Sequence, residues 1–239
     1  MLPLIKRLYK KTLLKKSDNS NIDDDVPETW IKIFYKEYPR LKFISLSNNT
    51  VQSEYDTLLS LRESSRYFSD RVVSFDDFSK ILSSCKIVDT TRDPEKRTYP
   101  SGGARFPVEI YLISHNIENL EQGAYHYNIK RQGLELLLQK DLRGFSRDLI
   151  SPYLENPAAT IIFTSVLSRS EIKYGYKAFQ YSFLEAGHMG QNMLLKCAEI
   201  GIGCCPVSGF VNDTVNNILD ITSEEIPLYT ISIGWRKNI

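Results

Sequence analysis

The stretch RSEIKYGYKAFQYSFLEAGHMGQNMLLKCAEIGIG, residues 169–203, decides the fold of this chain. Apolar and small side chains recur in it at steps of three and four residues, which predicts one long buried helix near residues 172–200. This stripe comprises Phe179, Phe183, Ala186, Gly190, Met193, Leu194 and Cys197. Because Ala186 and Gly190 lie one turn apart, another backbone can approach that face closely, as at a subunit interface. Glycine inside a helix costs about 0.8–1 kcal/mol relative to alanine, so we expect a reason for it beyond stability.

The composition predicts a globular domain and excludes several classes of partner. The chain has 239 residues, 42% of them hydrophobic, and a formal net charge of +1. This length accommodates one domain with a sizeable core, and the near-neutral charge gives no reason to expect nucleic acid. No apolar run reaches the roughly 20 residues that a membrane span needs.

The cysteines and the basic start of the chain bear on its location. Residues 1–16 lack the continuous apolar core and cleavage site of a signal peptide, which favours a cytoplasmic location. In the cytosol we expect reduced thiols at Cys85, Cys197, Cys204 and Cys205. Since neither these cysteines nor the scattered histidines have metal-ligand spacing, we expect no metal site.

The first 26 residues are expected to lie outside the main domain, which we place at residues 27–239. Residues 1–16 interleave six Lys or Arg with leucine. They predict a frayed basic helix or arm, with a helix that docks on a membrane surface or a partner as the alternative. The polar, acidic stretch KSDNSNIDDD that follows predicts a flexible linker.

The rest of the chain mixes helix and strand patterns without strict β-α-β alternation, so we predict an α+β domain. A helix that Pro39 ends is predicted from the spacing of Trp30, Ile33, Phe34 and Tyr38. A second helix is predicted over SFDDFSKILSS, with Ser74 as its N-cap. Further helices are expected around 145–155 and 212–219. Strands are expected over residues 108–113, 123–129, 159–165 and 227–234.

Three basic or hydroxyl side chains in LRESSRYF suit the binding of a phosphate group. Arg62 and Arg66 offer planar donor forks and Ser64 a hydroxyl, although a solvated charged turn has the same composition. Arg236, near the end of the chain, is compatible with a phosphate contact or with an ordinary charged tail.

Two glycine-rich segments predict either tight turns or loops that lie against a ligand. TYPSGGARFP, residues 98–107, lacks both the P-loop pattern and the Rossmann pattern. EIGIGCCPVSGF, residues 199–210, predicts a loop that wraps on something flat and polar, although a helix C-cap explains Gly201 alone.

In this order and spacing, LRESSRYF, RTYPSGGARFPVEIYLI, KYGYKAFQYSFLEAGHMGQNMLL and GIGCCPVSGF resemble the FMN-dependent nitroreductase superfamily. More narrowly, they resemble its SagB-type dehydrogenase branch, the thiazoline/oxazoline oxidases of ribosomal peptide biosynthesis. The resemblance spans about residues 28–236. It implies an α+β fold with a central, mostly antiparallel sheet flanked by helices. It also implies an intertwined homodimer with two FMN molecules at the interface, in which the small-residue stripe of the long helix packs against the dimer mate.

The resemblance also assigns roles to individual residues. The Arg-x-Ser-x-Arg segment would hold FMN, the turn at Pro100 would lie along the isoalloxazine, from either subunit, and the PVSGF backbone would reach the flavin N5 edge. The implied cofactor-binding residues are Arg62, Ser64, Arg66, Pro100, Ser101, Gly102, Gln191, Ser208, Gly209 and Arg236. His188 is interpreted as a hydrogen-bonded histidine in a dimer core rather than as an acid or base.

Lys173 and Tyr174 match the catalytic pair of that branch. Conversion of an azoline to an azole removes two hydrogens from adjacent carbons, one as a proton and one as a hydride to flavin N5. Lysine and tyrosine ordinarily titrate near ~10.4 and ~10, so a base of either type needs a pKa lowered by its surroundings. Because neighbours on a helix point about 100° apart, the pair is expected at a helix start or in a loop if both act.

The implied function is dehydrogenation of azolines to azoles on a ribosomally made precursor peptide, beside a cyclodehydratase and with oxygen as electron acceptor. Two alternatives stay open. One is an NAD(P)H-dependent reductase of the same fold that acts on a nitro, quinone or dehydroamino-acid substrate. The other is a non-catalytic scaffold subunit whose basic arm docks a partner.

Overall fold

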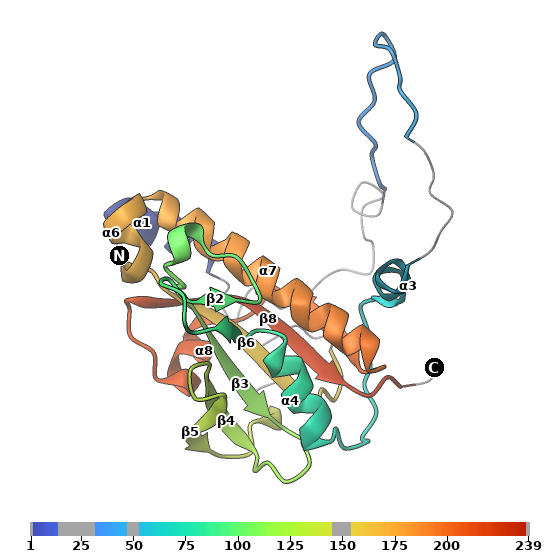
Figure 1. Cartoon of the computed structure of the whole chain (residues 1–239). Helices are drawn as coiled ribbons and strands as arrows, with labels where there is room; N and C mark the ends of the chain where they lie inside the picture. Colours follow the sequence, from blue (N-terminus) through green and yellow to red (C-terminus); the bar gives the residue numbers. More distant parts are fainter. Residues whose placement is uncertain (1, 14–31, 47–52, 145–153, 238–239) are drawn as a thin grey trace.

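The structure is a computed structural model that describes residues 2–13, 32–46, 53–144 and 154–237. Its centre is a six-stranded sheet in the order β5-β4-β3-β6-β8-β7 (Figure 1), in which every paired strand is antiparallel. The strands are β3 (Val108–Ser114), β4 (Gly123–Asn128), β5 (Gly133–Gln139), β6 (Ala159–Val166), β7 (Gly203–Val207) and β8 (Glu225–Gly234). A separate two-stranded sheet joins β1 (Ile87–Asp89) to β2 (Lys96–Arg97). The predicted α+β class is confirmed.

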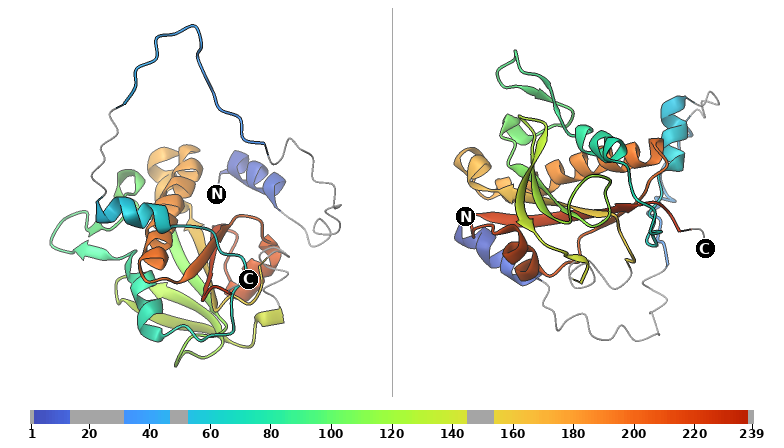
Figure 2. Two further views of the ribbon diagram at one scale, coloured as in Figure 1. Left: turned by 90° about the vertical axis from the view of Figure 1, so that its right-hand side faces the viewer. Right: turned by 90° about the horizontal axis from the view of Figure 1, so that it is seen from below.

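Helices cover both faces of the sheet (Figures 1 and 2). The helices are α1 (Pro3–Thr12), α3 (Glu54–Leu61), α4 (Phe75–Ser83), the 3-10 helix η2 (Gly102–Ala104), α6 (Ser168–Tyr174), α7 (Lys177–Glu199) and α8 (Asn212–Leu219). Side chains of α4 and α7 form one core with alternate residues of β3 and β6, such as Leu112 and Phe163. Side chains of α8 form the second core with residues from the other face, such as Ile113 and Ile162. Because both faces are covered, β6 is buried along almost its whole length.

Most of the predicted elements are present. The four predicted strands correspond to β3, β4, β6 and β8, and the helices predicted at 74–84 and 212–219 correspond to α4 and α8. Ser74 caps α4 as expected, because its hydroxyl accepts the backbone N–H of Asp77 at 3.1 Å. The helix predicted around residues 145–155 falls mostly outside the described residues, and Leu154 and Glu155 are not helical.

The prediction of a helix that Pro39 ends is wrong for its described part. Residues 32–38 are not helical, and residues 32–46 run as an exposed segment that stands away from the domain (Figures 1 and 2). Phe34 is 72% exposed and Phe43 87%. A short amphipathic helix is marginal in water unless its apolar face packs. Nothing in the described part of this chain covers that face, and Trp30 lies outside the described residues.

The long helix begins later than predicted. Gly175, with φ of 54°, separates α6 from α7, so the helix that fills residues 177–199 excludes the Lys-Tyr pair. Its small-residue stripe also faces a different partner from the one expected. A Cβ at Gly190 would lie 2.6 Å from the ring of Tyr229 on β8, so this stripe packs on the chain's own sheet rather than on a dimer mate.

The segment 201–210 is only partly the loop that was predicted. Gly201 is the expected C-cap, with φ of 75°. Residues 203–207, however, form the edge strand β7, because Cys204 and Cys205 are buried and pair with β8. Only residues 201–202 and 208–210 are irregular.

The basic N-terminal helix is present and packs on the domain. Ile5 of α1 is 1% exposed and belongs to the core, and the Tyr9 hydroxyl accepts a hydrogen bond from Asn212 of α8 at 2.9 Å. The Leu2 backbone N–H donates to Glu171 of α6 at 3.1 Å. Residues 3–12 are therefore part of the folded unit.

Candidate active site

Lys173 and Tyr174 meet at the 98–107 loop, which contains η2. A Cβ at Gly103 would overlap the Tyr174 hydroxyl and lie 2.9 Å from Lys173 Nζ, so both polar groups converge on this glycine. The ring of Tyr174 packs edge-on against Tyr181 of α7, with centroids 5.0 Å apart. In turn, the ring of Tyr181 would lie 3.1 Å from a Cβ at Gly102. The predicted catalytic pair and the predicted flavin loop are thus neighbours within one chain.

The local backbone explains how two adjacent residues reach the same point. Tyr174 is the last residue of α6, and Gly175 then turns the chain away. The loop opposite has positive φ at Gly103, Ala104 and Phe106, with values of 60°, 52° and 46°. Such angles are unfavourable for residues other than glycine, so surrounding contacts must hold them.

Arginine side chains tie the loop to α6. Arg105 Nε donates to the carbonyl of Arg169 at 2.8 Å, and Arg169 Nη1 donates to the carbonyl of Phe106 at 3.2 Å. Arg169 also forms an ion pair with Glu109 at the start of β3. These reciprocal contacts fix the loop next to Lys173 and Tyr174.

A single carboxylate on α7 anchors the same loop. Glu185 of α7 is 2% exposed, and it accepts hydrogen bonds from the Ser101 hydroxyl and, at 3.4 Å, from the Val108 backbone N–H. Ser101 Oγ in turn accepts the backbone N–H of Phe106 at 2.9 Å. Burial raises the pKa of the Glu185 carboxyl to about 7, against the hydrogen bonds from Ser101 and Val108, which lower it.

The outer side of the loop opens on a shallow hollow of about 310 Å³. Its walls are mostly apolar and include Leu184, which is 60% exposed. The lining residues are Pro100, Ser101, Gly102, Tyr181, Leu184, Glu185 and His188. Such a surface suits the flat face of an aromatic ligand.

The predicted phosphate-binding residues form a second cluster around β7. Ser64 pairs with Cys204 in a parallel bridge, and the Ser65 backbone N–H donates to the carbonyl of Cys204 at 2.8 Å. A hydrogen bond from Cys197, together with the guanidinium groups of Arg236 and Arg62, holds the pKa of the Cys204 thiol below its usual value.

Arg66 and Arg236 complete this second cluster. Arg66 offsets part of the rise that burial gives the pKa of the Cys205 thiol. Arg236 forms an ion pair with Glu63, and its neighbourhood is crowded, because a Cβ at Gly203 would lie 2.8 Å from Arg236 Cγ. Three guanidinium groups and the hydroxyl of Ser64 therefore gather at the β7 edge of the sheet.

The two clusters lie at opposite ends of α7. The 98–107 loop packs on Tyr181 and Glu185, whereas the second cluster lies beside β7, which follows the helix end at Glu199. Along α7 the rise to Glu199 is about 16 Å from His188, which lines the hollow, and about 27 Å from Tyr181. Figure 1 shows η2 and α6 at one end of α7, and α3 and the C-terminus at the other. One chain does not bring the predicted flavin residues together.

The remaining predicted residues are on the surface. Ser208 and Gly209 are exposed just after β7, and Gln191 and His188 are exposed on the outer side of α7. Within this one chain, His188 is exposed and has no hydrogen bond to the described residues. Its interpretation as a hydrogen-bonded histidine in a dimer core stays a prediction.

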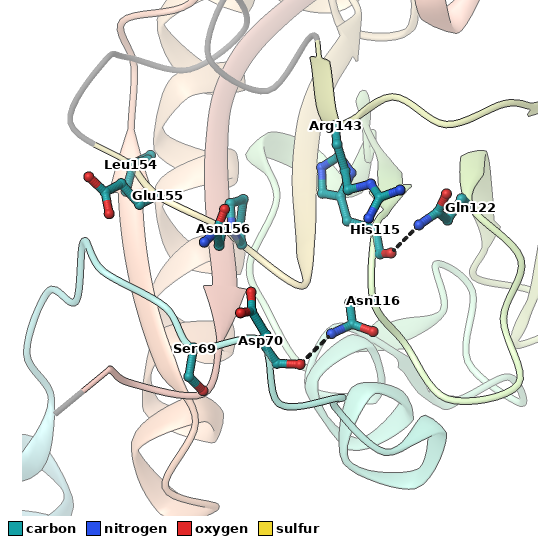
Figure 3. Close-up of a pocket in the computed structure, with 10 residues that line it drawn as sticks. Ser69, Asp70, His115, Asn116, Gln122, Arg143, Leu154, Glu155 and Asn156 are labelled. Carbon is teal, nitrogen blue, oxygen red and sulfur yellow. Dashed lines mark hydrogen bonds between the residues drawn. The ribbon is translucent and has the colours of Figure 1, made fainter.

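Another cavity lies away from both clusters. It has a volume of about 340 Å³ and contains side chains from the segment after Phe68, from the end of β3 and from the approach to β6 (Figure 3). His115 at its edge is 4% exposed, and both ring nitrogens lack a hydrogen-bond partner in the described structure. Burial lowers the pKa of His115 to about 4.

Several other kinds of site are not found in the described part of the chain. No group of three or more potential ligands could hold a metal ion, and no described helix is long and apolar enough to cross a membrane. Cys85, Cys197, Cys204 and Cys205 are all buried free thiols.

Comparison with known proteins identifies the family. The profile of the Nitroreductase family matches residues 59–235 of the 239, which include both clusters except Arg236. The chain belongs to the Nitroreductase family, as its motifs and its antiparallel sheet led us to expect.

Particular relatives are of two kinds. MJ1384 of Methanocaldococcus jannaschii, provisionally named a nitroreductase, is 27% identical over 182 residues, 75% of this chain and 89% of that protein. The microcin B17-processing protein McbC of Escherichia coli is 28% identical over 138 residues, 55% of this chain and 51% of McbC. A chain of the E. coli microcin synthetase McbBCD complex with truncated pro-MccB17 bound has a TM-score of 0.78 at 22% identity. That match covers 100% of this chain and 95% of the other, and it shows a shared fold.

Sequence reasoning missed Glu185, Tyr181 and Arg169, which hold the loop and the catalytic pair. A signal for Glu185 existed. It lies three residues after Ser182 and four before Met189, on the buried face of α7. A carboxylate on a buried helix face is rarely left without a partner, so its position alone indicated a hydrogen-bonded role.

Proposed function

We propose that this protein is an FMN-dependent oxidoreductase that dehydrogenates azoline rings to azoles on a ribosomally made precursor peptide. The observation that carries the proposal is the convergence of Lys173 Nζ and the Tyr174 hydroxyl on Gly103 of the Pro-Ser-Gly-Gly loop. The similarity to McbC, which is named for microcin processing, supports a peptide substrate.

The residues present fit FMN as two half-sites. Arg62, Arg66 and Arg236, with the Ser64 hydroxyl, offer the donor set that a phosphate needs. The apolar hollow beside Pro100 suits an isoalloxazine ring. About 16–27 Å of α7 separates the two half-sites, so a flavin that touches both is expected to use halves from different chains. We therefore propose a homodimer in which each site combines the phosphate half of one chain with the loop half of its partner.

The chain's own residues would handle the proton in this reaction. Bound FMN supplies the hydride acceptor. An azoline ring that becomes an azole loses one hydrogen as that hydride and its neighbour as a proton, so atoms and electrons balance. Lys173 and Tyr174 lie on the loop side of the site, where they would accept the proton from the ring carbon. The loop and Tyr181 would keep their polar ends directed at one point.

Partners follow from the same comparison. The solved McbBCD complex contains a bound precursor peptide, and one of its chains shares this fold. We propose that this protein likewise acts on its peptide beside a cyclodehydratase.

The test uses purified full-length protein, FMN and an azoline-bearing peptide. The wild type should bind FMN and remove two hydrogens per ring, measured by mass spectrometry. Lys173→Ala should retain FMN and lose the oxidation, whereas Lys177→Ala, which replaces an exposed lysine at the start of α7, should retain both. A protein that takes up no FMN, or a fully active Lys173→Ala, would contradict the proposal.

An NAD(P)H-dependent nitroreductase is the second candidate. It is favoured by MJ1384, which matches this chain over 89% of its length. Rapid bleaching of bound flavin by NADPH, with no turnover of azoline peptide, would support this candidate over the first.

A further inference from the structure

The 98–107 loop is held by one buried carboxylate, and this arrangement suggests a positioning role. We propose that Glu185 positions the flavin-facing loop against α7, and that ionisation of its carboxyl loosens the loop. The inference rests on the proposed function only for the statement that this loop faces flavin. The hydrogen bonds by which Glu185 holds the loop, called the clamp below, lie within one chain and do not depend on flavin.

The hydrogen bonds form a connected set that holds both ends of the loop. Glu185 accepts from Ser101 near the start and from the Val108 N–H just after the end, and Ser101 Oγ accepts the N–H of Phe106. Residues 103–106 between these points include two non-glycine residues with positive φ. Strained backbone of this kind persists only where surrounding contacts over-determine it. Without the carboxylate, the strained segment would lose contacts at both of its ends.

The protonation state of Glu185 decides how strong this clamp is. The hydrogen bonds from Ser101 and Val108 lower the pKa of this carboxyl, but desolvation by burial has the larger effect and raises the pKa to about 7. The closed loop leaves Glu185 only 2% exposed, so it favours the protonated carboxyl, whereas ionisation favours an open loop in which water reaches the charge. The loop is therefore held more weakly at high pH, and the change falls near neutrality.

The other charged and titratable groups around Glu185 do not compete for this role. Arg97 from β2 and Arg169 from α6 act on the carboxyl as cations, and arginine stays charged throughout. Burial raises the pKa of the Tyr99 hydroxyl well above its usual value and that of the Cys85 thiol to about 12. His188, which lines the same hollow as Glu185, is also titratable and exposed. Its contribution is common to the wild type and Glu185→Gln, so the comparison of these two proteins isolates the effect of Glu185.

Loop order also reaches the catalytic pair. Gly103, at the middle of the clamped segment, contacts the polar ends of Tyr174 and Lys173. A loop that loosens would therefore release the pair and the surface beside Pro100 together. Glu185 acts through the loop, so it is a positioning residue and not a catalytic one.

The first test measures the loop without flavin. Hydrogen exchange of the Phe106 and Val108 amides would be followed in the full-length protein at pH 6 and pH 8.5, corrected for intrinsic exchange rates. We expect about tenfold greater protection at pH 6 than at pH 8.5 in the wild type. Glu185→Gln, which keeps the side-chain shape but cannot ionise, should show equal protection at both pH values. Glu118→Gln, an exposed glutamate in the loop after β3, should behave as the wild type. Equal protection in the wild type, or an unchanged pH response in Glu185→Gln, would overturn the inference.

The second test measures FMN affinity at the same two pH values by flavin fluorescence. The FMN phosphate itself titrates near pH 6, so the ratio of affinities in Glu185→Gln serves as the reference. Relative to that ratio, the wild type should bind about tenfold more weakly at pH 8.5 than at pH 6. Ser101→Ala, which removes one bond of the clamp and leaves the carboxyl, should weaken loop protection at pH 6; full protection in this variant would contradict the clamp.

The two proposals can fail separately. If no FMN binds at either pH but the loop responds to Glu185, the proposed function fails and the positioning role stands. If FMN binds and azolines are oxidised while the loop ignores Glu185, the positioning role fails and the function stands.

Discussion

Replacement of Glu185 by glutamine should change how the stability of the protein depends on pH. Burial raises the pKa of this carboxyl from the ordinary 4.5 to about 7, and the side chain is 2% exposed. Between these values the folded protein keeps the proton that the unfolded chain releases. The free energy of unfolding therefore falls as pH rises from 4.5 to 7, and it has lost about 3 kcal/mol above that range. Glutamine carries no such charge, so the variant escapes this loss.

The assay is urea unfolding of the wild type and of Glu185→Gln at several pH values from 4.5 to 8. The difference in free energy of unfolding, variant minus wild type, should rise by about 3 kcal/mol across this range, because the other titrating groups cancel. Glu118→Gln should give a flat difference. A difference for Glu185→Gln that changes by less than about 0.5 kcal/mol would refute the reasoning, since the carboxyl could not then be desolvated as the structure has it.

Three further changes have expected outcomes. Gly103→Ala should destabilise the protein by about 1–2 kcal/mol in urea unfolding and displace the catalytic pair, because alanine disfavours φ of 60° and its Cβ meets the Tyr174 hydroxyl; Gly133→Ala, at ordinary φ, should not. Mixing inactive Arg62→Ala and Lys173→Ala chains should restore about a quarter of the azoline oxidation if each site combines two chains, and none if it does not. His115→Phe should, relative to wild type, gain about 3 kcal/mol in the free energy of unfolding as pH falls from 6.5 to 4, because the buried imidazole resists the proton that the unfolded chain takes up.

His115 and Glu185 change the free energy of unfolding of the wild type in opposite directions as pH rises. His115 makes stability rise between pH 4 and 6.5, whereas Glu185 makes it fall between pH 4.5 and 7. Over the shared range their contributions largely cancel. A flat pH profile in the wild type would therefore say little about either group, and only the single variants reveal them.

The sequence was sufficient where local pattern and burial agree. β3, β4, β6 and β8 are rich in β-branched or aromatic residues, and the Ser74 cap and apolar spacing located α4. One helix that the sequence analysis missed also has a local signal. The capping box of Ser53 and Asp56 precedes α3 and could have been recognised, since the side chain of each residue accepts the backbone N–H of the other.

Other failures were tertiary in origin. Residues 32–38 have a helical pattern but no surface to pack on in the described chain, so the pattern has nothing to stabilise it. Residues 203–207 contain glycine and proline, which are poor strand formers, yet they form β7 because they pair with β8 and bury Cys204 and Cys205. In both cases the surroundings decide against the local preference.

The candidate site was predictable residue by residue but not as a geometry. The motifs selected Lys173, Tyr174 and the Pro100 turn, and the structure brings these together at Gly103. No sequence spacing shows that residues about 70 apart touch, or that Glu185 lies beneath them. Nor does it show that Arg62 lies at the far end of α7, which is what makes a second chain necessary to the proposed flavin site.

The glycines of the 169–203 stretch make sense when each is matched to its neighbour. Gly175 ends α6 so that the Lys-Tyr pair can turn toward the loop, Gly190 leaves room for Tyr229, and Gly201 caps α7 before β7 begins. Gly187 has open space where its side chain would be, on the outer side of α7 beside the exposed Leu184. Glycine at this position costs up to about 1 kcal/mol of helix stability, and no contact within the described chain explains it. The proposed dimer explains it, because a small residue beside an exposed leucine lets a partner helix approach the surface between the two half-sites.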